Sequence, residues 1–159
     1  MTATISVSSV IPAPVEQVWA TWNEPERIPD WIPAVKSVRR RRVGEKSEGA
    51  GAELEFTVRN AWRTITYRTR ISEWEEGRLV RSDIVPGSGS GVWTSTLDRQ
   101  TTEWSFEPEN GNTRITATQE MKLKGPLDLL SALWLWIFDR QLYKRAFRKL
   151  ATLATREAA

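Results

Sequence analysis

The sequence has no cysteine and no histidine among its 159 residues. Disulfides, metal sites built on Cys or His, and the Ser-His-Asp and Cys-His nucleophile pairs are therefore excluded. Histidine is also the commonest general base near neutral pH. Any catalysis must depend on Asp, Glu, Tyr, Lys, Arg or a bound water, and we expect neither a metal nor another cofactor.

The N-terminus lacks the features of a targeting segment. Residues 1–6 contain neither a positively charged stretch nor an apolar run, so a signal peptide is not indicated. A cytoplasmic location is the default expectation.

Length and composition are those of a globular protein. We expect residues 1–159 to form one domain, because a chain of this size buries roughly 70% of its unfolded surface. Hydrophobic residues make up 40% and charged residues 27% of the chain. The nine tryptophans suit both a large core and a pocket for flat apolar ligands, so composition does not choose between them.

Positive charge is concentrated in two places although the net charge is only +3. One cluster is Lys36 with Arg39 to Arg42, and the other lies on residues 140–149. Basic patches can bind anionic partners. Because no known nucleic-acid-binding motif accompanies them, we do not expect nucleic acid as a partner.

Hydrophobic periodicity predicts a strand followed by two short helices at the N-terminus. Residues 5–10 alternate imperfectly before Pro12, as in a strand. Val15, Val18, Trp19 and Trp22 then form one apolar stripe of a helix. A second short helix is predicted over residues 26–31, between two prolines.

The period changes to two between about residues 35 and 123, which predicts an antiparallel meander. The expected strands are 35–43, 52–59, 63–75, 78–85, 93–108, with a break near residues 98–100, and 113–123. Asn110-Gly111 is the strongest hairpin signal between them. The Gly- and Ser-rich residues 87–91 are expected to form a mobile hairpin tip.

A helical period returns after Gly125-Pro126 and continues to about residue 156. Such a helix would be roughly 45 Å long, enough to cross the sheet. Its buried stripe would consist of Leu142, Ala146, Phe147, Leu150 and Leu153.

This order of elements resembles the helix-grip fold of the START-like (SRPBCC) superfamily, which includes birch-pollen-allergen-like proteins and the polyketide cyclase/dehydrase and lipid-transport families. The resemblance covers nearly the whole chain and rests on residues 11–19 (IPAPVEQVW), 29–35 (PDWIPAV), 104–108 (WSFEP), 111–115 (GNTRI) and 125–126 (GP). It implies an α+β fold with a curved antiparallel sheet of about seven strands around a long C-terminal helix. The family motifs identify no catalytic residue in this chain.

What the resemblance implies about function is a cavity for hydrophobic molecules between sheet and helix. Our first hypothesis is therefore binding or transport of a lipid, quinone, polyketide or aromatic compound. The alternative is a polyketide cyclase/dehydratase-type enzyme that uses the same cavity without a metal or histidine. A third hypothesis is a membrane- or protein-interaction module acting through residues 129–138.

Seven residues are predicted to line the cavity, because each lies on the apolar phase of its strand or on the facing helix. They are Tyr67, Thr69, Trp104, Phe106, Gln119, Met121 and Trp134. Gln119 is the most informative, since a buried amide needs hydrogen-bond partners. Its partner is either a neighbouring side chain or water, or a ligand. Glu73 follows on the same face if alternation persists, but near a strand end it is more often exposed.

The four consecutive arginines at positions 39–42 must point alternately to opposite faces of a strand. One pair could therefore approach the mouth of the cavity and bind a ligand carboxylate or phosphate. The alternative is that all four extend into water.

Residues 129–138 (LLSALWLWIF) are apolar around the whole helix. Ten residues are too few to span a bilayer. The segment must be covered by the short helices and hairpin tips, by a second copy of the chain in a homodimer, or by transient contact with a membrane surface. Trp134 and Trp136 point in different directions, so at least one should face the cavity entrance.

Overall fold

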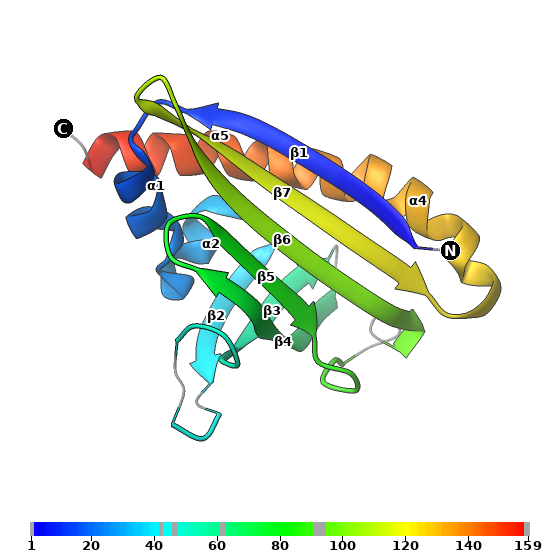
Figure 1. Ribbon diagram of the computed structural model, residues 1–159. Helices are drawn as coiled ribbons and strands as arrows, with labels where there is room; N and C mark the ends of the chain where they lie inside the picture. Colours follow the sequence, from blue (N-terminus) through cyan, green and yellow to red (C-terminus); the bar gives the residue numbers. More distant parts are fainter. Residues whose placement is uncertain (1, 42, 46–47, 61–62, 91–94, 158–159) are drawn as a thin grey trace.

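Seven antiparallel strands form one curved sheet in the computed structural model, which describes residues 2–41, 43–45, 48–60, 63–90 and 95–157. The order across the sheet is β1-β7-β6-β5-β4-β3-β2 (Figure 1). The strands are β1 (Ala3–Ile11), β2 (Val35–Arg41), β3 (Glu53–Asn60), β4 (Arg63–Glu75), β5 (Leu79–Ile84), β6 (Leu97–Glu109) and β7 (Asn112–Leu123).

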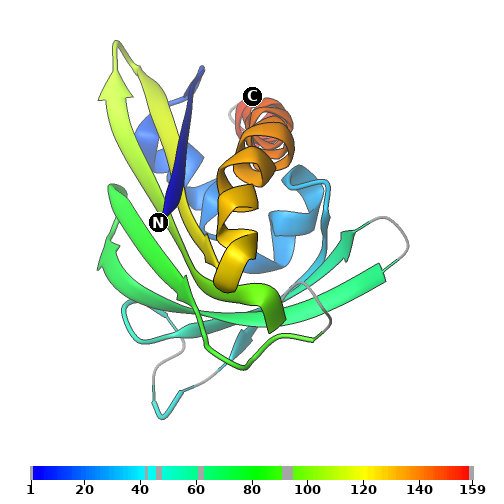
Figure 2. The same ribbon diagram turned by 90° about the vertical axis from the view of Figure 1, so that its right-hand side faces the viewer.

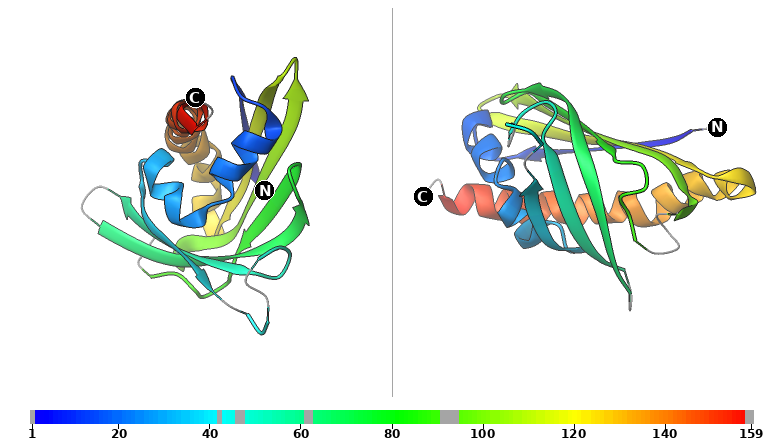
Figure 3. Two further views of the ribbon diagram at one scale, coloured as in Figure 1. Left: turned by 90° about the vertical axis from the view of Figure 1, so that its left-hand side faces the viewer. Right: turned by 90° about the horizontal axis from the view of Figure 1, so that it is seen from below.

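The helices lie on one side of this sheet. Figure 2 shows the C-terminal helix inside the curve, and the left view of Figure 3 shows the N-terminal helices beside it. They are α1 (Val15–Trp22), η1 (Pro25–Arg27), α2 (Ile28–Trp31), η2 (Gly125–Leu130), α4 (Ser131–Trp134), η3 (Leu135–Asp139) and α5 (Arg140–Glu157). The expected helix-grip fold is confirmed.

Alternation along the strands determines which side chains face the helix. Along β7, Ile115, Ala117, Gln119 and Met121 are all buried, and the residues between them are half-buried. Asn110 and Gly111 turn the chain from β6 into β7 with φ of 52° and 80°, as a type I′ hairpin turn requires. The sequence pattern therefore predicted correctly both the buried face of β7 and the turn that precedes it.

The C-terminal helix differs from the regular helix that the sequence predicted. Gly125–Leu130 is a 3-10 helix, and Leu135–Asp139 is a π-helical turn, in which hydrogen bonds close over one residue more than in an α-helix. Leu135, Asp139 and Tyr143 follow one another at intervals of four residues and all face the sheet side: Leu135 and Tyr143 are buried, and Asp139 is largely so.

An aromatic cluster fills the end of the fold nearest the N-terminal helices. Trp19 packs edge-on against Trp74 and Phe106, with ring centroids 5.2 Å apart in both pairs. Trp22 packs against Phe106 at the same distance, 5.2 Å, and contacts Trp104 at 5.8 Å. Trp19 and Phe106 are therefore enclosed by other rings, whereas Trp22, Trp74 and Trp104 also line a small cavity.

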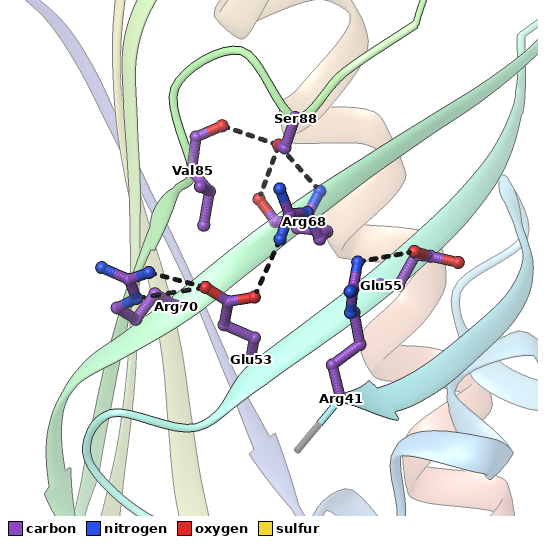
Figure 4. A network of polar contacts seen from close by, with 7 residues as sticks. All are labelled: Arg41, Glu53, Glu55, Arg68, Arg70, Val85 and Ser88. Carbon is purple, nitrogen blue, oxygen red and sulfur yellow. Dashed lines mark hydrogen bonds and ion pairs between the residues drawn. The ribbon is translucent and has the colours of Figure 1, made fainter. Parts of the chain in front are cut away.

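The outer face of the sheet is tied together by ion pairs across β3 and β4. Glu53 is only 3% exposed and accepts hydrogen bonds from Arg70 at 2.7 Å and from Arg68 at 3.2 Å (Figure 4). The hydrogen bond from Arg70 is the main reason that the pKa of Glu53 lies below its usual value. Ser88 lies beside this network, and its hydroxyl accepts a hydrogen bond from the backbone amide of Arg68 at 3.1 Å (Figure 4).

The structure corrects the expected hairpin tip and places Glu73 on the outer face, the alternative that its position near a strand end favoured. The run from Val85 to Ser90 is not a free tip, because backbone and Ser hydroxyl hydrogen bonds anchor it along β4. Residue 91 of the expected tip lies outside the described residues. A register irregularity between Ile71 and Glu73 turns Glu73 outward, where it pairs with Arg81 at 3.1 Å.

Candidate functional site

The main cavity lies between the inner face of the sheet and the C-terminal helix and has a volume of about 320 Å³. Strands β2 to β7 line it from the sheet, residues 134–143 line it from the C-terminal helix, and Ile32 and Ala34 line it from the segment between α2 and β2. Its lining consists of Ile32, Ala34, Val35, Phe56, Val58, Arg59, Ile65, Tyr67, Thr69, Ser82, Ile84, Gln100, Thr102, Trp104, Gln119, Trp134, Phe138, Asp139, Leu142 and Tyr143.

Most of this lining is apolar or aromatic, with a few polar groups. Phe56 stacks on Tyr67 across β3 and β4, with ring centroids 5.5 Å apart. Arg59 and Phe138 are exposed lining residues, so the cavity opens to solvent near them. Small-molecule sites in proteins commonly combine an apolar wall with a few fixed polar groups, at volumes of roughly 300–1,000 Å³.

A hydrogen-bonded chain connects the helix to the sheet inside the cavity. The Gln119 amide donates to Asp139 Oδ2 at 2.8 Å, and the Tyr143 hydroxyl donates to Gln119 Oε1. Asp139 ends the π-helical turn, and Tyr143 follows it in α5. Gln119 is in register with Thr102 of β6. The buried amide therefore has two helix partners and still lines the cavity.

Burial raises the pKa values of three titratable groups in the cavity lining. It raises the pKa of Asp139 from 3.8 to about 6, although the hydrogen bond from Gln119 partly opposes the rise. Burial also raises the pKa of Tyr67 to about 12 and that of Tyr143 above its usual value. At neutral pH the site therefore holds one largely ionised carboxylate and two neutral phenols.

A smaller cavity of about 90 Å³ continues from the main one toward α2. Ile32, Phe56, Thr69, Ser82 and Trp104 line both. Two buried polar atoms here, Thr69 Oγ1 and Trp31 Nε1, have no hydrogen-bond partner among the described residues. Each is a donor that a ligand or water could satisfy.

Five of the seven predicted cavity residues do line the main cavity: Tyr67, Thr69, Trp104, Gln119 and Trp134. The other two do not. Phe106 is covered by Trp19 and Trp22 of α1, and Met121 is fully buried in a separate cluster with Leu135. Alternation identified the correct face for both, but not which helix residue covers that face.

The sequence analysis missed Asp139 and Tyr143, the two polar residues that the helix contributes. A usable signal was present, because Asp139 is the only acidic residue between positions 129 and 156. An isolated carboxylate next to an apolar run is unusual in a surface helix. The side of the helix on which Asp139 lies could not be inferred, however, because the hydrophobic pattern of the sequence does not reveal the π-helical turn.

The consecutive arginines at positions 39–41 point alternately to opposite faces of β2, as expected for a strand. Arg40 lines the smaller cavity, pairs with Glu26 and Glu48, and donates to the Asn23 carbonyl at 3.3 Å. Arg39 and Arg41 are exposed. Arg42 lies outside the described residues. The single arginine at the main cavity is Arg59, which the sequence analysis did not single out.

The profile of the family described as "Polyketide cyclase / dehydrase and lipid transport" matches residues 2–155. No curated protein matches the chain in sequence.

Several solved structures share the fold. The ZhuI aromatase/cyclase from a Streptomyces species superposes with a TM-score of 0.78 at 13% identity, covering 100% of this chain and 97% of that one. Norcoclaurine synthase from Thalictrum flavum, a point mutant bound to a transition-state analogue, gives 0.73 at 13% identity over 100% and 98%. Ara h 8.0201 gives 0.72 at 18% identity over 98% and 99%. At these identities the likeness concerns the fold.

Proposed function

The chain belongs to the polyketide cyclase/dehydrase and lipid transport family, and from this premise we propose that it binds or carries one hydrophobic small molecule in the main cavity. The observation that supports this is the cavity of about 320 Å³ with mostly apolar walls and the hydrogen-bonded pair Gln119 and Asp139 in its lining. Tyr67, Thr69, Trp104, Gln119 and Trp134 are proposed as ligand contacts. Candidate ligands are a lipid, quinone, polyketide or aromatic compound.

Titration with the neutral apolar dye N-phenyl-1-naphthylamine tests this proposal. We expect saturable binding at one site per protein, with energy transfer from Trp104 and Trp134, which line the cavity. Thr69→Trp should abolish binding by filling the space. Thr64→Trp is the matched control, because Thr64 lies on the same strand but is exposed. No saturable binding by the parent protein, or equal loss in both variants, contradicts the proposal.

A second candidate function is cyclisation and dehydration of a polyketone in the same cavity. Asp139 favours it, because a carboxylate with a pKa of about 6 can accept a proton near neutral pH. Asp139 would take a proton from a methylene between two carbonyls, and Tyr67 would hydrogen-bond the carbonyl that the carbanion attacks. Intramolecular aldol addition and loss of water then need no oxidant.

This second candidate requires catalysis beyond binding. A linear aromatic-ended triketone should lose one water in the presence of the protein, as followed by mass spectrometry. Asp139→Asn should remove the rate enhancement and retain the triketone's affinity. If turnover is absent in the parent protein while the triketone binds, the chain is a carrier for such compounds and the enzyme candidate fails.

The partner of the exposed apolar segment is a separate question. Six of its side chains are exposed: Leu129 by 83%, Trp136 by 60%, Phe138 by 54%, and Leu130, Leu133 and Ile137 by 42% or more. No described helix is long and apolar enough to cross a membrane. Phe138 belongs both to this surface and to the cavity lining, so whatever covers the segment also lies at the cavity.

We favour an anionic membrane surface over a homodimer as this partner, on grounds of charge. The solvent-facing side of α5 carries Arg140, Lys144, Arg145, Arg148 and Lys149. In the described part of the chain, none of these forms an ion pair. Basic residues beside exposed Trp, Phe and Leu suit the interface of an anionic bilayer. Two copies of this surface would bring like charges together.

Vesicle flotation distinguishes the two partners. The protein should float with vesicles of phosphatidylcholine and phosphatidylglycerol, and less with phosphatidylcholine alone. Trp136→Glu should abolish flotation. Val10→Glu, which alters another exposed apolar side chain, should not. A dimer in sedimentation that Trp136→Glu dissociates would overturn the membrane assignment. The expected cytoplasmic location stays a prediction that cell fractionation can check.

A further inference from the structure

Asp139 is the only carboxylate among the residues that line the main cavity. Its Oδ2 accepts a hydrogen bond from the Gln119 amide, and Oδ1 has no partner among the residues described. No described Arg or Lys forms an ion pair with it, and the only cation lining the cavity is Arg59 at the mouth. Among the described residues, the carboxylate in the cavity wall therefore carries a negative charge with no cation paired to it.

Folding alone gives no reason for this arrangement. A largely buried carboxylate without a cationic partner is costly, and an Asn at this position could accept the same hydrogen bond without a charge. Gln119 is itself held by Tyr143, so the amide is aimed at the carboxylate and orients it. The charge is thus kept in place and faces a space large enough for a ligand.

The walls around the carboxylate are also suited to a positive charge. Six aromatic residues line the main cavity: Phe56, Tyr67, Trp104, Trp134, Phe138 and Tyr143. The negative face of an aromatic ring attracts a cation, most strongly where water is excluded. A carboxylate with aromatic walls is the combination that binds an organic ammonium group.

We propose that the cavity takes an apolar or aromatic amine, with its protonated nitrogen at Asp139 Oδ1 and its hydrocarbon part against the aromatic walls. This rests on the proposed binding function and narrows its ligand class. The nitrogen donates one hydrogen bond to the carboxylate that Gln119 positions. Anionic lipids such as fatty acids are disfavoured in this orientation, because their carboxylate would lie against Asp139.

Three probes of the same shape test the charge preference. They are 2-naphthylmethylammonium, 2-naphthylmethanol and 2-naphthoate, titrated calorimetrically into the wild-type protein slightly above neutral pH. We expect the ammonium to bind at least about tenfold more tightly than the alcohol, because a charge-assisted hydrogen bond is about twice as strong as a neutral one. The naphthoate should bind most weakly.

Asp139→Asn is the decisive variant because it removes the charge and retains the acceptor for Gln119. It should bring the ammonium and alcohol affinities to within about twofold of each other, while the alcohol affinity stays near its wild-type value. Asp98→Asn is the matched control: it removes the same charge from the surface, where Asp98 pairs with Lys122 at 3.4 Å. It should leave the tenfold preference unchanged.

The outcomes separate this inference from the binding function on which it rests. If no naphthyl probe binds, the proposed cavity function fails. If the alcohol binds as well as the ammonium in the wild-type protein, or if the preference survives Asp139→Asn, the amine assignment is overturned and apolar binding stands.

Acid titration gives an independent readout. The ammonium affinity should fall as the pH drops below about 6, because Asp139 becomes protonated. The other titratable groups at the cavity are Tyr67 of β4, Tyr143 of α5 and Arg59 of β3, and burial raises the pKa of both tyrosines, away from that range. The alcohol affinity should not change. An ammonium affinity independent of pH contradicts the assignment.

Discussion

Replacing Asp139 by Asn should stabilise the folded protein near neutral pH. The reason is that burial raises the pKa of this carboxyl from 3.8 to about 6. In the unfolded chain the group loses its proton near pH 3.8, whereas in the folded protein it keeps the proton until about pH 6. Between these values the folded state binds more protons, so the free energy of unfolding falls as the pH rises.

The size of the effect follows from the same difference. Two pKa units, at about 1.4 kcal/mol per unit, correspond to about 3 kcal/mol. Asn lacks this cost and can still accept the hydrogen bond from Gln119. The stability difference in favour of Asp139→Asn should therefore grow from small near pH 4 to about 3 kcal/mol above pH 7.

Urea unfolding followed by tryptophan fluorescence, repeated from about pH 4 to about pH 8, measures this difference directly. Asp98→Asn serves as the control because Asp98 is exposed and paired with Lys122. A stability difference between Asp139→Asn and wild type that stays constant over this pH range would refute the assignment of a buried, charged carboxylate.

Other substitutions should separate cavity from packed core. Tyr143→Phe should cost about 1–3 kcal/mol in urea unfolding, because Gln119 Oε1 loses its only protein donor among the described residues. Thr69→Trp should abolish dye binding at a cost below about 1 kcal/mol, whereas Ala117→Trp should cost at least about 1–3 kcal/mol, because Ala117 is fully buried and does not line the cavity. Equal losses of stability in Thr69→Trp and Ala117→Trp would contradict the distinction between cavity and packed core. Phe106→Ala should cost about 3–5 kcal/mol, since Trp19 and Trp22 both pack edge-on against that fully buried ring; a loss below about 1 kcal/mol would show that it is not core.

The fold could be predicted from the sequence because its signals are local. Alternation in residues 63–75 and 113–123 and the Asn110-Gly111 turn each depend on neighbours along the chain. The same signals placed Gln119 on the inner face. Strand β6 begins at Leu97, later than the expected residue 93, and the expected break near residues 98–100 is present as a register irregularity between Leu97 and Arg99.

The site could be predicted only in part, because a cavity depends on which elements cover which stretch of a strand. Phe106, Trp104 and Gln119 all face inward, but α1 covers the first and the helix leaves space beside the other two. The π-helical turn that presents Asp139 is a tertiary feature with no local pattern. Ala117 lies on the same inward face as Gln119 but is fully buried outside the cavity, because alternation cannot tell core from cavity.

Isoleucine methyl NMR with a bound apolar probe tests the central claim most directly, because isoleucines lie both at the cavity and away from it. Ile32, Ile65 and Ile84 line the main cavity, whereas Ile11 and Ile115 are fully buried in the packed core. On titration with 2-naphthylmethanol, the ring current should shift the methyl signals of Ile32, Ile65 and Ile84 saturably and leave those of Ile11 and Ile115 nearly unchanged. Shifts confined to the exposed Ile137, or no saturable shift at any isoleucine, would contradict a ligand-binding cavity.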